Sequence, residues 1–432
     1  MPHSFVVSNL IVMLLACPAL CAETKSIEPN WPQWRGPKRD GVSTEKGLQH
    51  EWGADGPRLA WKASGLGGGF ASVSVAAGMI FTMGDRNKEQ FVEALDADGG
   101  KLLWSTKISD AWKDNNYLGP RCTPTVDGDR VYAIGTYGDL VCLDRQTGAV
   151  RWKKNFAQDF DGKMMSGWGF SESPLVDGDK LVCTPGGPDA TIVALNKKTG
   201  DEIWRAKVPA LGDKGKDGAA YSSIVVSEAD GQRQYVQLLG RGVVGISADD
   251  GKFLWGYNRI ANGTANIPTP IVNGDYVFCS TGYQTGAALL KINRTDKGFE
   301  AEEVYFLDPK TLQNHHGGMV LVGDYLYGGS GHNAGFPVCV DWKSGKIVWN
   351  GGRGAGSGSA AVVYADGHLY FRYQNGVMAQ IVATPKGYEL KGNFEIPAAD
   401  GNKKPSWPHP VVVGGKLYLR EQDQLFCYDL MR

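Results

Sequence analysis

Residues 140–152, LVCLDRQTGAVRW, bring four chemically capable side chains into one short span. Cys142 supplies a thiol, Asp144 a carboxylate, Arg145 a guanidinium and Trp152 an aromatic ring. A nucleophile beside an acid or base is a common arrangement in enzyme sites. Whether this span is a site depends on whether the rest of the chain repeats it.

The same pattern recurs in four other segments of the chain. They read VEALDADGGKLLW, IVALNKKTGDEIW, VVGISADDGKFLW and VCVDWKSGKIVW, and they end at Trp104, Trp204, Trp255 and Trp349. Alanine takes the place of Cys142 in two copies, which indicates a small buried residue there. Asp144 begins a turn in which its side chain accepts backbone N–H groups and Gly148 takes a left-handed conformation. We therefore interpret the span as a structural joint and look for chemistry where the copies differ.

The spacing of the tryptophans predicts the architecture. Trp104, Trp152, Trp204 and Trp255 are 48, 52 and 51 residues apart, and Tyr305 and Phe394 occupy weaker equivalent positions. A period near fifty that contains strands indicates a propeller or a solenoid. Short alternating strands with Asp-Gly, Asn-Gly and Gly-Gly turns predict four antiparallel strands per unit.

We predict an all-β, eight-bladed propeller. The blades are expected at 66–108, 115–156, 166–208, 217–258, 265–308, 314–350, 357–396 and 405–432. The last blade has only three strands of its own, whereas an orphan strand at 58–62 carries Trp61 where the repeat tryptophan belongs. This N-terminal strand is expected to complete the last blade, which closes the ring and removes its free edges.

The repeat tryptophans are interpreted as structural. On the outermost strand, each ring can fill the wedge between two blades while its indole N–H donates to a carbonyl of the adjoining turn. The set comprises Trp61, Trp104, Trp152, Trp204, Trp255 and Trp349.

The first residues predict export. An apolar core at residues 10–16 followed by small residues is typical of a signal peptide, here residues 1–22. The alternative is a lipoprotein signal that ends before Cys17, since Leu-Leu-Ala-Cys resembles a lipobox. Both indicate a periplasmic or secreted protein, and the second adds a lipid anchor. No later stretch approaches ~20 apolar residues, so we expect no transmembrane helix.

Three parts are expected: the signal, an extended arm at 23–56 and the propeller at 57–432. Trp31 and Trp34 in the arm are too costly to leave in water, so the arm should pack on the body. A net charge of -1 without basic runs argues against nucleic acid as a partner. Six cysteines lie beyond the signal, but they occupy equivalent slots in different blades, and we expect no disulfide. We expect a monomer.

Candidate ligand-binding residues lie at the tops of the innermost strands, which converge on the axis. Aligned on Pro124, the copies place Arg121, Ser171, Ile267, His316 and Trp407 at one position, with Glu172 one residue after Ser171. Arg121 suits a carboxylated cofactor, Glu172 a metal ligand or catalytic base, and Trp407 stacking, with His316 a further axial candidate. The alternative is a water-filled channel in which these polar residues pair with each other or with water.

Metal and nucleotide motifs are missing from the sequence. Neighbours on a strand point to opposite faces, so His315 and His316 are not expected to share a metal ion. No H-x-x-x-H, C-x-x-C, G-x-S-x-G or phosphate-loop spacing occurs. We predict no metal site.

The segments 94–104, 143–152 and 194–204 resemble the tryptophan-docking repeat of the pyrroloquinoline-quinone-like eight-bladed propellers. That family includes quinoprotein alcohol dehydrogenases and the non-enzymatic assembly lipoprotein BamB. In the dehydrogenases, the resemblance implies a quinone held by a tryptophan and a vicinal disulfide, with Ca²⁺ and an Asp base. This chain has no Cys-Cys pair and no C-x-x-C-H haem motif.

Two functions therefore remain open. The first is an exported binding or scaffolding module at the cell envelope, with an envelope protein or glycan as partner. Its contact surface is expected on the loops at 110–118, 158–169, 210–218 and 398–404, with Trp112, Tyr117 and Trp168 as anchors. The alternative is a quinoprotein oxidoreductase of an alcohol or sugar that uses pyrroloquinoline quinone and Ca²⁺.

Overall fold

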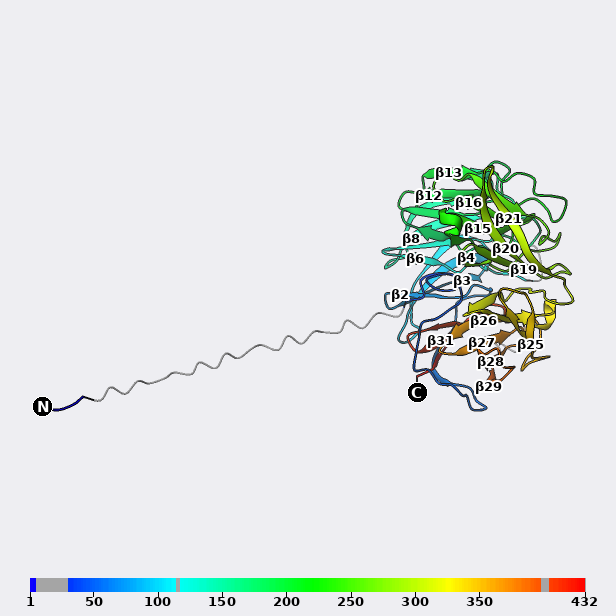
Figure 1. Cartoon of the computed structure of the whole chain (residues 1–432). Coiled ribbons are helices and arrows are strands. Elements are labelled where there is room, and N and C mark those ends of the chain that lie inside the picture. Colours follow the sequence, from blue (N-terminus) through cyan, green and yellow to red (C-terminus); the bar gives the residue numbers. More distant parts are fainter. Residues whose placement is uncertain (5–29, 114–116, 398–403, 432) are drawn as a thin grey trace.

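The computed structural model describes residues 1–4, 30–113, 117–397 and 404–431. The signal peptide beyond residue 4, Cys17 and most of the loop at 398–404 lie outside the described residues. The described chain forms eight four-stranded antiparallel sheets arranged as an eight-bladed β-propeller (Figure 1), which confirms the predicted fold.

Each of the first four blades is a meander of four consecutive strands. The first has β2 (Ser74–Ala76), β3 (Met79–Arg86), β4 (Glu89–Asp96) and β5 (Leu102–Asp110). The second has β6 (Thr125–Asp127), β7 (Arg130–Ile134), β8 (Asp139–Asp144) and β9 (Val150–Asn155), followed by the short helix α1 (Phe156–Phe160). The third has β10 (Leu175–Asp177), β11 (Lys180–Cys183), β12 (Ile192–Asn196) and β13 (Glu202–Ala206). The fourth has β14 (Val225–Ser227), β15 (Gln234–Leu239), β16 (Gly242–Ser247) and β17 (Phe253–Tyr257), with a 3-10 turn η1 (Ala229–Gly231).

The remaining blades keep this order except for the last. The fifth has β18 (Ile271–Asn273), β19 (Tyr276–Thr281), β20 (Gly286–Thr295) and β21 (Gly298–Leu307). The sixth has β22 (Met319–Val322), β23 (Tyr325–Ser330), η2 (His332–Ala334), β24 (Phe336–Asp341) and β25 (Ile347–Asn350). The seventh has β26 (Ala360–Ala365), β27 (His368–Tyr373), β28 (Val377–Val382) and β29 (Leu390–Glu395). The eighth has β30 (Val411–Val413), β31 (Lys416–Glu421) and β32 (Gln424–Asp429), and its fourth strand is β1 (Arg58–Ala63).

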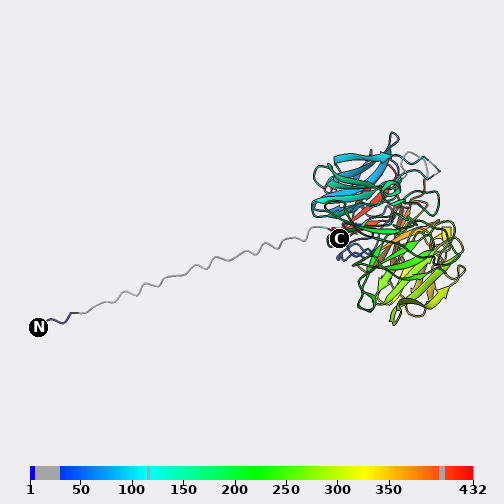
Figure 2. The same ribbon diagram turned by 90° about the horizontal axis from the view of Figure 1, so that it is seen from above.

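The N-terminal strand closes the ring, as predicted. β1 pairs antiparallel with β32, and Trp61 lies opposite Cys427. One apolar cluster joins Val75 and Ile80 of the first blade to Val412 and Leu417 of the last. The first and last blades accordingly lie side by side in both ribbon views (Figures 1 and 2). Each blade is thereby a complete four-stranded sheet, with one edge strand at the axis and one at the outer rim.

The joint around Asp144 has the predicted turn geometry. The Asp144 carboxylate accepts hydrogen bonds from the backbone N–H groups of Gln146 at 3.0 Å and Thr147 at 2.9 Å. Gly148 has a φ of 71°, and a register shift between Cys142 and Leu143 marks the bulge. Asp144 is therefore occupied by its own turn. Hydrogen bonds from Arg151 and Thr147 further stabilise its charged form and lower the carboxyl pKa.

Four of the six repeat tryptophans pack against a turn glycine of the following blade. The ring of Trp104 lies where a side chain on Gly148 would begin, and Trp152 has the same relation to Gly200. The Trp104 indole N–H donates to the Arg145 carbonyl at 2.9 Å, and that of Trp349 to the Thr384 carbonyl at 2.8 Å. Trp61, Trp204 and Tyr305 repeat the ring-on-glycine contact at Gly100, Gly251 and Gly345.

Three of the six tryptophans, Trp61, Trp204 and Trp255, do not make the expected hydrogen bond to a carbonyl of the adjoining turn within the described residues. The Trp255 indole donates to the Gln234 side chain in its own blade at 2.5 Å, because the next blade replaces the short turn with the ten-residue strands β20 and β21. The Trp204 indole nitrogen has no hydrogen-bond partner within the described part of the chain. Four tryptophans thus make the ring contact, and three, Trp104, Trp152 and Trp349, make the hydrogen bond.

The residue opposite each aromatic explains the placement of three cysteines, Cys142, Cys339 and Cys427. Small residues face the tryptophans in register, and the pairs are Ala94 with Trp104, Cys142 with Trp152, Ala194 with Trp204, Gly245 with Trp255 and Cys339 with Trp349. Where the aromatic is smaller, the partner is larger: Leu289 faces Tyr305 and Met378 faces Phe394. The combined volume of the two facing side chains therefore varies little from blade to blade, as expected in a close-packed interior. All six cysteines in the described residues are free and buried.

The arm before β1 covers one end of the propeller axis. Trp31 forms a bridge to Val75 of β2, and the Val126 N–H of β6 donates to the Pro32 carbonyl at 2.8 Å. Glu45 accepts hydrogen bonds from Gly414 and Gly415 N–H groups in the first hairpin turn of the last blade. The arm therefore packs on the body, and it does so at the end where these hairpin turns lie. No helix of the described residues is long and apolar enough to cross a membrane.

Candidate functional site

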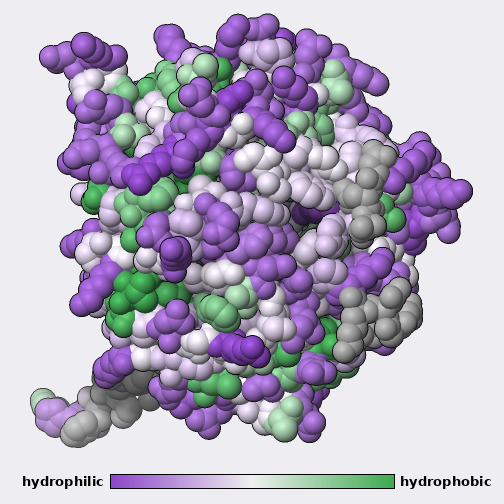
Figure 3. All heavy atoms as spheres, turned by 90° about the vertical axis from the view of Figure 1, so that its right-hand side faces the viewer, coloured by the Kyte–Doolittle hydropathy of each residue, from purple (hydrophilic) through white to green (hydrophobic). Residues whose placement is uncertain are grey.

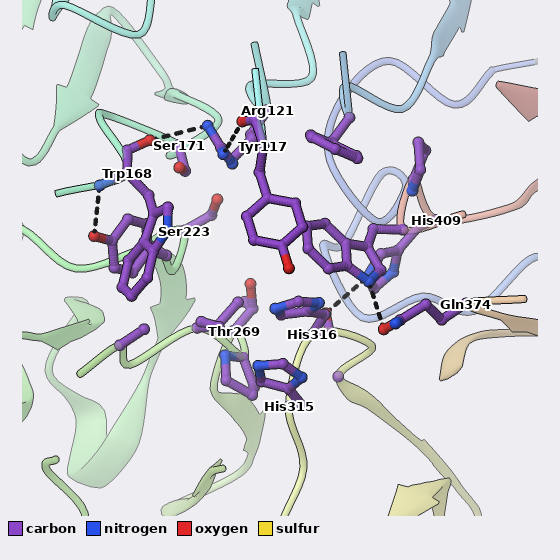
Figure 4. A pocket seen from close by; sticks show the side chains of 18 of the residues that line it. Tyr117, Arg121, Trp168, Ser171, Ser223, Thr269, His315, His316, Gln374 and His409 are labelled. Atoms are coloured by element: carbon purple, nitrogen blue, oxygen red, sulfur yellow. Dashed lines mark hydrogen bonds between the residues drawn. The ribbon is translucent and has the colours of Figure 1, made fainter. Parts of the chain in front are cut away.

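A cavity of about 410 Å³ lies on the axis between the arm and the loops that join successive blades. The arm supplies Trp34 and Arg35 to its lining. The interblade loops supply most of the rest, including Phe70, Arg121 and Trp407. The lining is thus an aromatic and basic set drawn from nearly every blade (Figure 4).

Three of the four axial candidates line this cavity: Arg121, His316 and Trp407. Ser171 and Ile267, which share their alignment position, line it as well. Alignment of the repeats thus identified one ring of positions around the axis, because equivalent residues in a closed propeller lie at equivalent heights. Whether any of these side chains binds a ligand stays a prediction.

Glu172 takes a different place from the one expected of an axial ligand. It is 3% exposed and does not line the cavity. Its carboxyl group accepts hydrogen bonds from the Thr184 N–H at 2.7 Å, the Thr184 hydroxyl at 2.9 Å and Gln237 at 3.2 Å. Ser171 faces the cavity, and its extended neighbour Glu172 turns between the blades. Burial raises the pKa of Glu172 to about 7 despite these bonds.

Arg121 is held in place by backbone carbonyls rather than by a carboxylate. It donates to the Trp168 carbonyl at 2.9 Å and the Tyr117 carbonyl at 2.7 Å (Figure 4). Its guanidinium also lies over the Phe70 ring, 5.6 Å from the ring centroid. No acidic side chain of the described residues forms an ion pair with it. Burial lowers its pKa to about 10, so the guanidinium remains charged near neutral pH.

Four histidines gather at the cavity, and His315 and His316 do not point to opposite faces as expected. Their rings stack with centroids 3.6 Å apart, and both line the cavity. The expected alternation of faces was wrong because these residues lie in the loop before β22, where strand geometry does not apply; that they share no metal ion stays a prediction. The His332 ring lies 4.2 Å from the His315 ring, and the Nε2–H of His409 donates to the His316 carbonyl at 3.2 Å.

These histidines are neutral near neutral pH. Burial, together with nearby positive groups, lowers the pKa of His315 and of His409 to about 3. The pKa of His316 lies well below its usual range for the same reasons, and burial also lowers that of His332. Within the described residues, no three His, Cys, Asp or Glu side chains are placed to hold a metal ion.

Sequence reasoning missed several lining residues. Trp34 donates to the Thr269 hydroxyl at 3.0 Å and packs on His409 at 4.4 Å, which fixes the arm beneath the cavity. Tyr283 contacts the His315 and His332 rings. His409 lies two residues after Trp407 in the aligned segment, so the alignment carried a signal for it. Tyr283 and His332 lie in turns within blades, where no repeat position marks them.

The loop aromatics proposed as anchors do not share one environment. Tyr117 and Trp168 line the cavity, with Tyr117 4.9 Å from the Trp407 ring. Trp112 instead packs on Tyr137 at 4.8 Å.

The chain matches a family described as "Outer membrane protein assembly factor BamB" over residues 87–351. That segment is more than half of the sequence. The chain belongs to this family of PQQ-like repeat propellers. The BamB protein of Xanthomonas campestris is 34% identical over 113 residues, which cover 25% of each chain. A 1-butanol dehydrogenase (quinone) of Thauera butanivorans is 28% identical over 146 residues, or 31% of this chain and 22% of that protein.

These matches span only about a quarter of the length of the curated relatives. Among solved structures, BamB from Moraxella catarrhalis aligns with a TM-score of 0.59 at 14% identity, covering 83% of this chain and 94% of the other. The quinohemoprotein alcohol dehydrogenase ADHIIG of Pseudomonas putida HK5 aligns with a TM-score of 0.60 at 16% identity, covering 93% and 80%. At such identities the likeness shows the fold alone.

Proposed function

We propose that this BamB-like propeller is an exported, non-enzymatic binding module that engages a partner protein at the cell envelope. The observation that carries the proposal is the chemistry of the axial cavity. Its lining contains no aspartate and no glutamate among the described residues. A scaffold needs neither, whereas a quinoprotein dehydrogenase needs both a Ca²⁺ ligand set and a carboxylate base.

The residues present do not fit a quinone with its Ca²⁺ ion. Ca²⁺ takes six to eight oxygen ligands, of which carboxylates are the main source in proteins. Glu172 is the nearest acidic candidate from the sequence, but its two oxygens are occupied by Thr184 and Gln237 between the blades. The free cysteines offer no vicinal disulfide. The dehydrogenase alternative is therefore the weaker one.

The partner surface is proposed on the interblade loops. The arm covers the opposite end of the axis, which leaves the loop end as the open face. On the face shown in Figure 3, hydrophilic residues cover most of the surface and hydrophobic ones form small separate groups. A loop surface of this kind suits a polar interface with a few aromatic anchors, such as Trp168. The role in outer membrane protein assembly for which the family is named supports an envelope protein over a glycan.

Photo-crosslinking in intact cells tests the partner. A photoreactive residue at the exposed Lys214, in the loop after β13, is expected to trap one defined envelope protein. The same residue at exposed Lys198, in the turn between β12 and β13 at the other end of the blade, is the matched control. Equal crosslinking from both positions, or none from Lys214, would contradict the proposed surface.

Reconstitution tests the enzyme alternative. Purified protein supplied with pyrroloquinoline quinone and Ca²⁺ should reduce an electron-accepting dye in the presence of alcohols or sugars no faster than a protein-free control. Turnover that Arg121→Ala or Glu172→Gln abolishes would overturn the non-enzymatic proposal.

A further inference from the structure

The fifth blade carries an edge strand that is longer than those of its sister blades. β21 is ten residues long and begins seven residues before Tyr305, the aromatic of its repeat. The outer strands of the other blades begin two to four residues before theirs. β20 and β21 are accordingly drawn as long arrows (Figure 1). The fifth blade therefore has an extended outer hairpin that the repeat itself does not require.

The outer edge of this hairpin is open. β21 is the last strand of its sheet, and no other strand of the described residues pairs with its outer side. Ile292 of β20 donates its N–H to the Asp275 carbonyl at 2.8 Å, away from β21. Antiparallel partners alternate between hydrogen-bonded and non-bonded pairs, so Ala301, which lies opposite Ile292, directs its own N–H to the open edge. Phe299 lies two residues earlier and does the same.

Contacts with the fourth blade hold the hairpin in place. The Arg294 N–H donates to the Asp230 carboxylate of η1 at 2.7 Å. Phe299 and Ala301 pack against the apolar cluster between the fourth and fifth blades. A strand that joins this edge would meet a preformed template, so little free energy is lost in ordering β21.

The face of β21 that points away from this cluster is acidic. Glu300 and Glu302 are exposed there, and neither belongs to an ion pair in the described part of the chain. Lys291 lies opposite Glu302 in register without forming such a pair. Glu303, by contrast, accepts a hydrogen bond from Arg259 at 2.8 Å. The open edge therefore presents two unpaired carboxylates on one face and apolar groups on the other.

These charges restrict which strand the edge can accept. Opposite charges on facing positions of two strands stabilise the pair, and like charges destabilise it. Charged side chains on an edge also prevent unspecific pairing. Because Glu300 and Glu302 are two residues apart, the matching basic residues of an added strand are two residues apart as well. The residues between them lie beside Phe299 and Ala301, where apolar side chains fit.

We propose that the outer edge of β21 binds an extended segment of a partner protein, in which lysine or arginine alternates with apolar residues, as a fifth strand of the fifth blade. The tip of this hairpin lies beside η1, among the hairpin turns at the arm end of the propeller. The surface proposed above lies on the interblade loops, so crosslinking at Lys214 and binding at β21 are tested separately.

Fluorescence anisotropy with the full chain tests the proposal. The probe is a labelled, capped octapeptide that alternates lysine and valine, and it should bind saturably. A peptide that alternates glutamate and valine should bind at least about tenfold more weakly. A peptide of the same composition as the probe, with its lysines in one block, should also bind more weakly, because it cannot place its charges on one face of a strand. Equal binding of the three peptides, or no binding of the alternating lysine peptide, would overturn the proposal.

Amide hydrogen exchange locates the bound peptide. The lysine–valine peptide should slow exchange in residues 298–303, where the N–H groups of Phe299 and Ala301 gain acceptors. Protection confined to the interblade loops would place the peptide elsewhere and contradict the proposal.

Variants separate the charge from the backbone edge. Replacing both carboxylates, by Glu300→Gln with Glu302→Gln, should weaken the lysine–valine peptide about fivefold. Ala301→Pro should weaken it at least about tenfold, because proline removes an N–H that faces the open edge. Glu395→Gln is the matched control, since Glu395 is an exposed glutamate on the outer strand β29. An equal effect of this control and of the double variant would overturn the proposal. Where Ala301→Pro fails to fold, the double variant and the exchange experiment still decide.

Sedimentation of the chain alone separates a partner protein from a second copy of this chain. The proposal predicts no association through this edge. Self-association that Glu300→Gln with Glu302→Gln abolishes would show that a second copy occupies the edge, and would overturn the proposed partner.

Discussion

The rim and the axis of this propeller follow opposite rules. At the rim, sister positions repeat one contact: the ring of Trp104 on Gly148, that of Trp152 on Gly200 and that of Trp204 on Gly251. At the axis, sister positions carry Arg121, Ser171, Ile267, His316 and Trp407, which share no chemistry. Residues that repeat from blade to blade lie where neighbouring blades contact each other. Residues that differ between blades lie around the axial cavity, which has no internal symmetry. The contacts between blades at the rim should therefore govern stability more than the side chains at the axis do.

The largest expected effect is at the rim. Trp104→Ala should lower the free energy of unfolding by about 3–5 kcal/mol, because it empties the wedge between the first two blades and leaves the Arg145 carbonyl unpaired. Urea unfolding followed by circular dichroism measures the loss.

Trp407→Ala is the matched axial variant. Its ring faces the cavity rather than a blade interface, so the loss of stability should be smaller than for Trp104→Ala. Equal losses would remove the distinction between rim and axis.

Acidification should lower the stability of the protein through histidines at the axis rather than through residues at the rim. The pKa of His409 is lowered to about 3 from its usual 6.5, so between these values the unfolded chain binds a proton that the folded chain does not. Stability is then lost as the pH falls through 6.5 toward 3, by about 2 kcal/mol per such histidine between pH 7 and pH 5. His315 should contribute in the same direction.

His409→Asn should reduce the difference between urea unfolding curves recorded at pH 7 and pH 5.

Glu172→Gln should have the opposite effect on the change in unfolding free energy between these two pH values. Because burial raises the pKa of Glu172 to about 7, the folded chain holds its proton up to that pH, and this group adds stability as the pH falls. Removing the carboxyl should therefore steepen the acid dependence. No change in either variant would show that these groups do not titrate as their burial implies.

The smallest loss of stability is expected at a rim position where sister blades already carry different small residues. Cys142→Ala places in the second blade the residue that stands opposite Trp104 and Trp204 in its neighbours. We expect a loss of about 1 kcal/mol or less by urea unfolding. Cys142→Leu is the contrasting variant, because a large side chain opposite a tryptophan overfills the pair and should cost about 1–3 kcal/mol. A greater loss for alanine than for leucine would contradict the volume argument.

The local parts of the fold could be predicted because each has a local cause. Alternating strands, Asp-Gly turns and the tryptophan spacing lie within one blade and recur in its copies, so each copy checks the others. The role of the strand around Trp61 could be predicted because the last blade has only three strands of its own, and this strand pairs with β32 as expected. The turn role of Asp144 likewise needed only its own five residues.

The sequence by itself thus determined the number of blades, the closing strand and the ring of axial positions that includes Arg121, His316 and Trp407. Only the tertiary structure decided which side chains meet inside that ring. The stacking of His315 on His316, the turn of Glu172 away from the cavity and the arm's delivery of Trp34 and Arg35 depend on segments without a repeat. Periodicity propagates only along hydrogen-bonded strands, whereas the loops and the arm take their conformations from contacts between residues far apart in the chain.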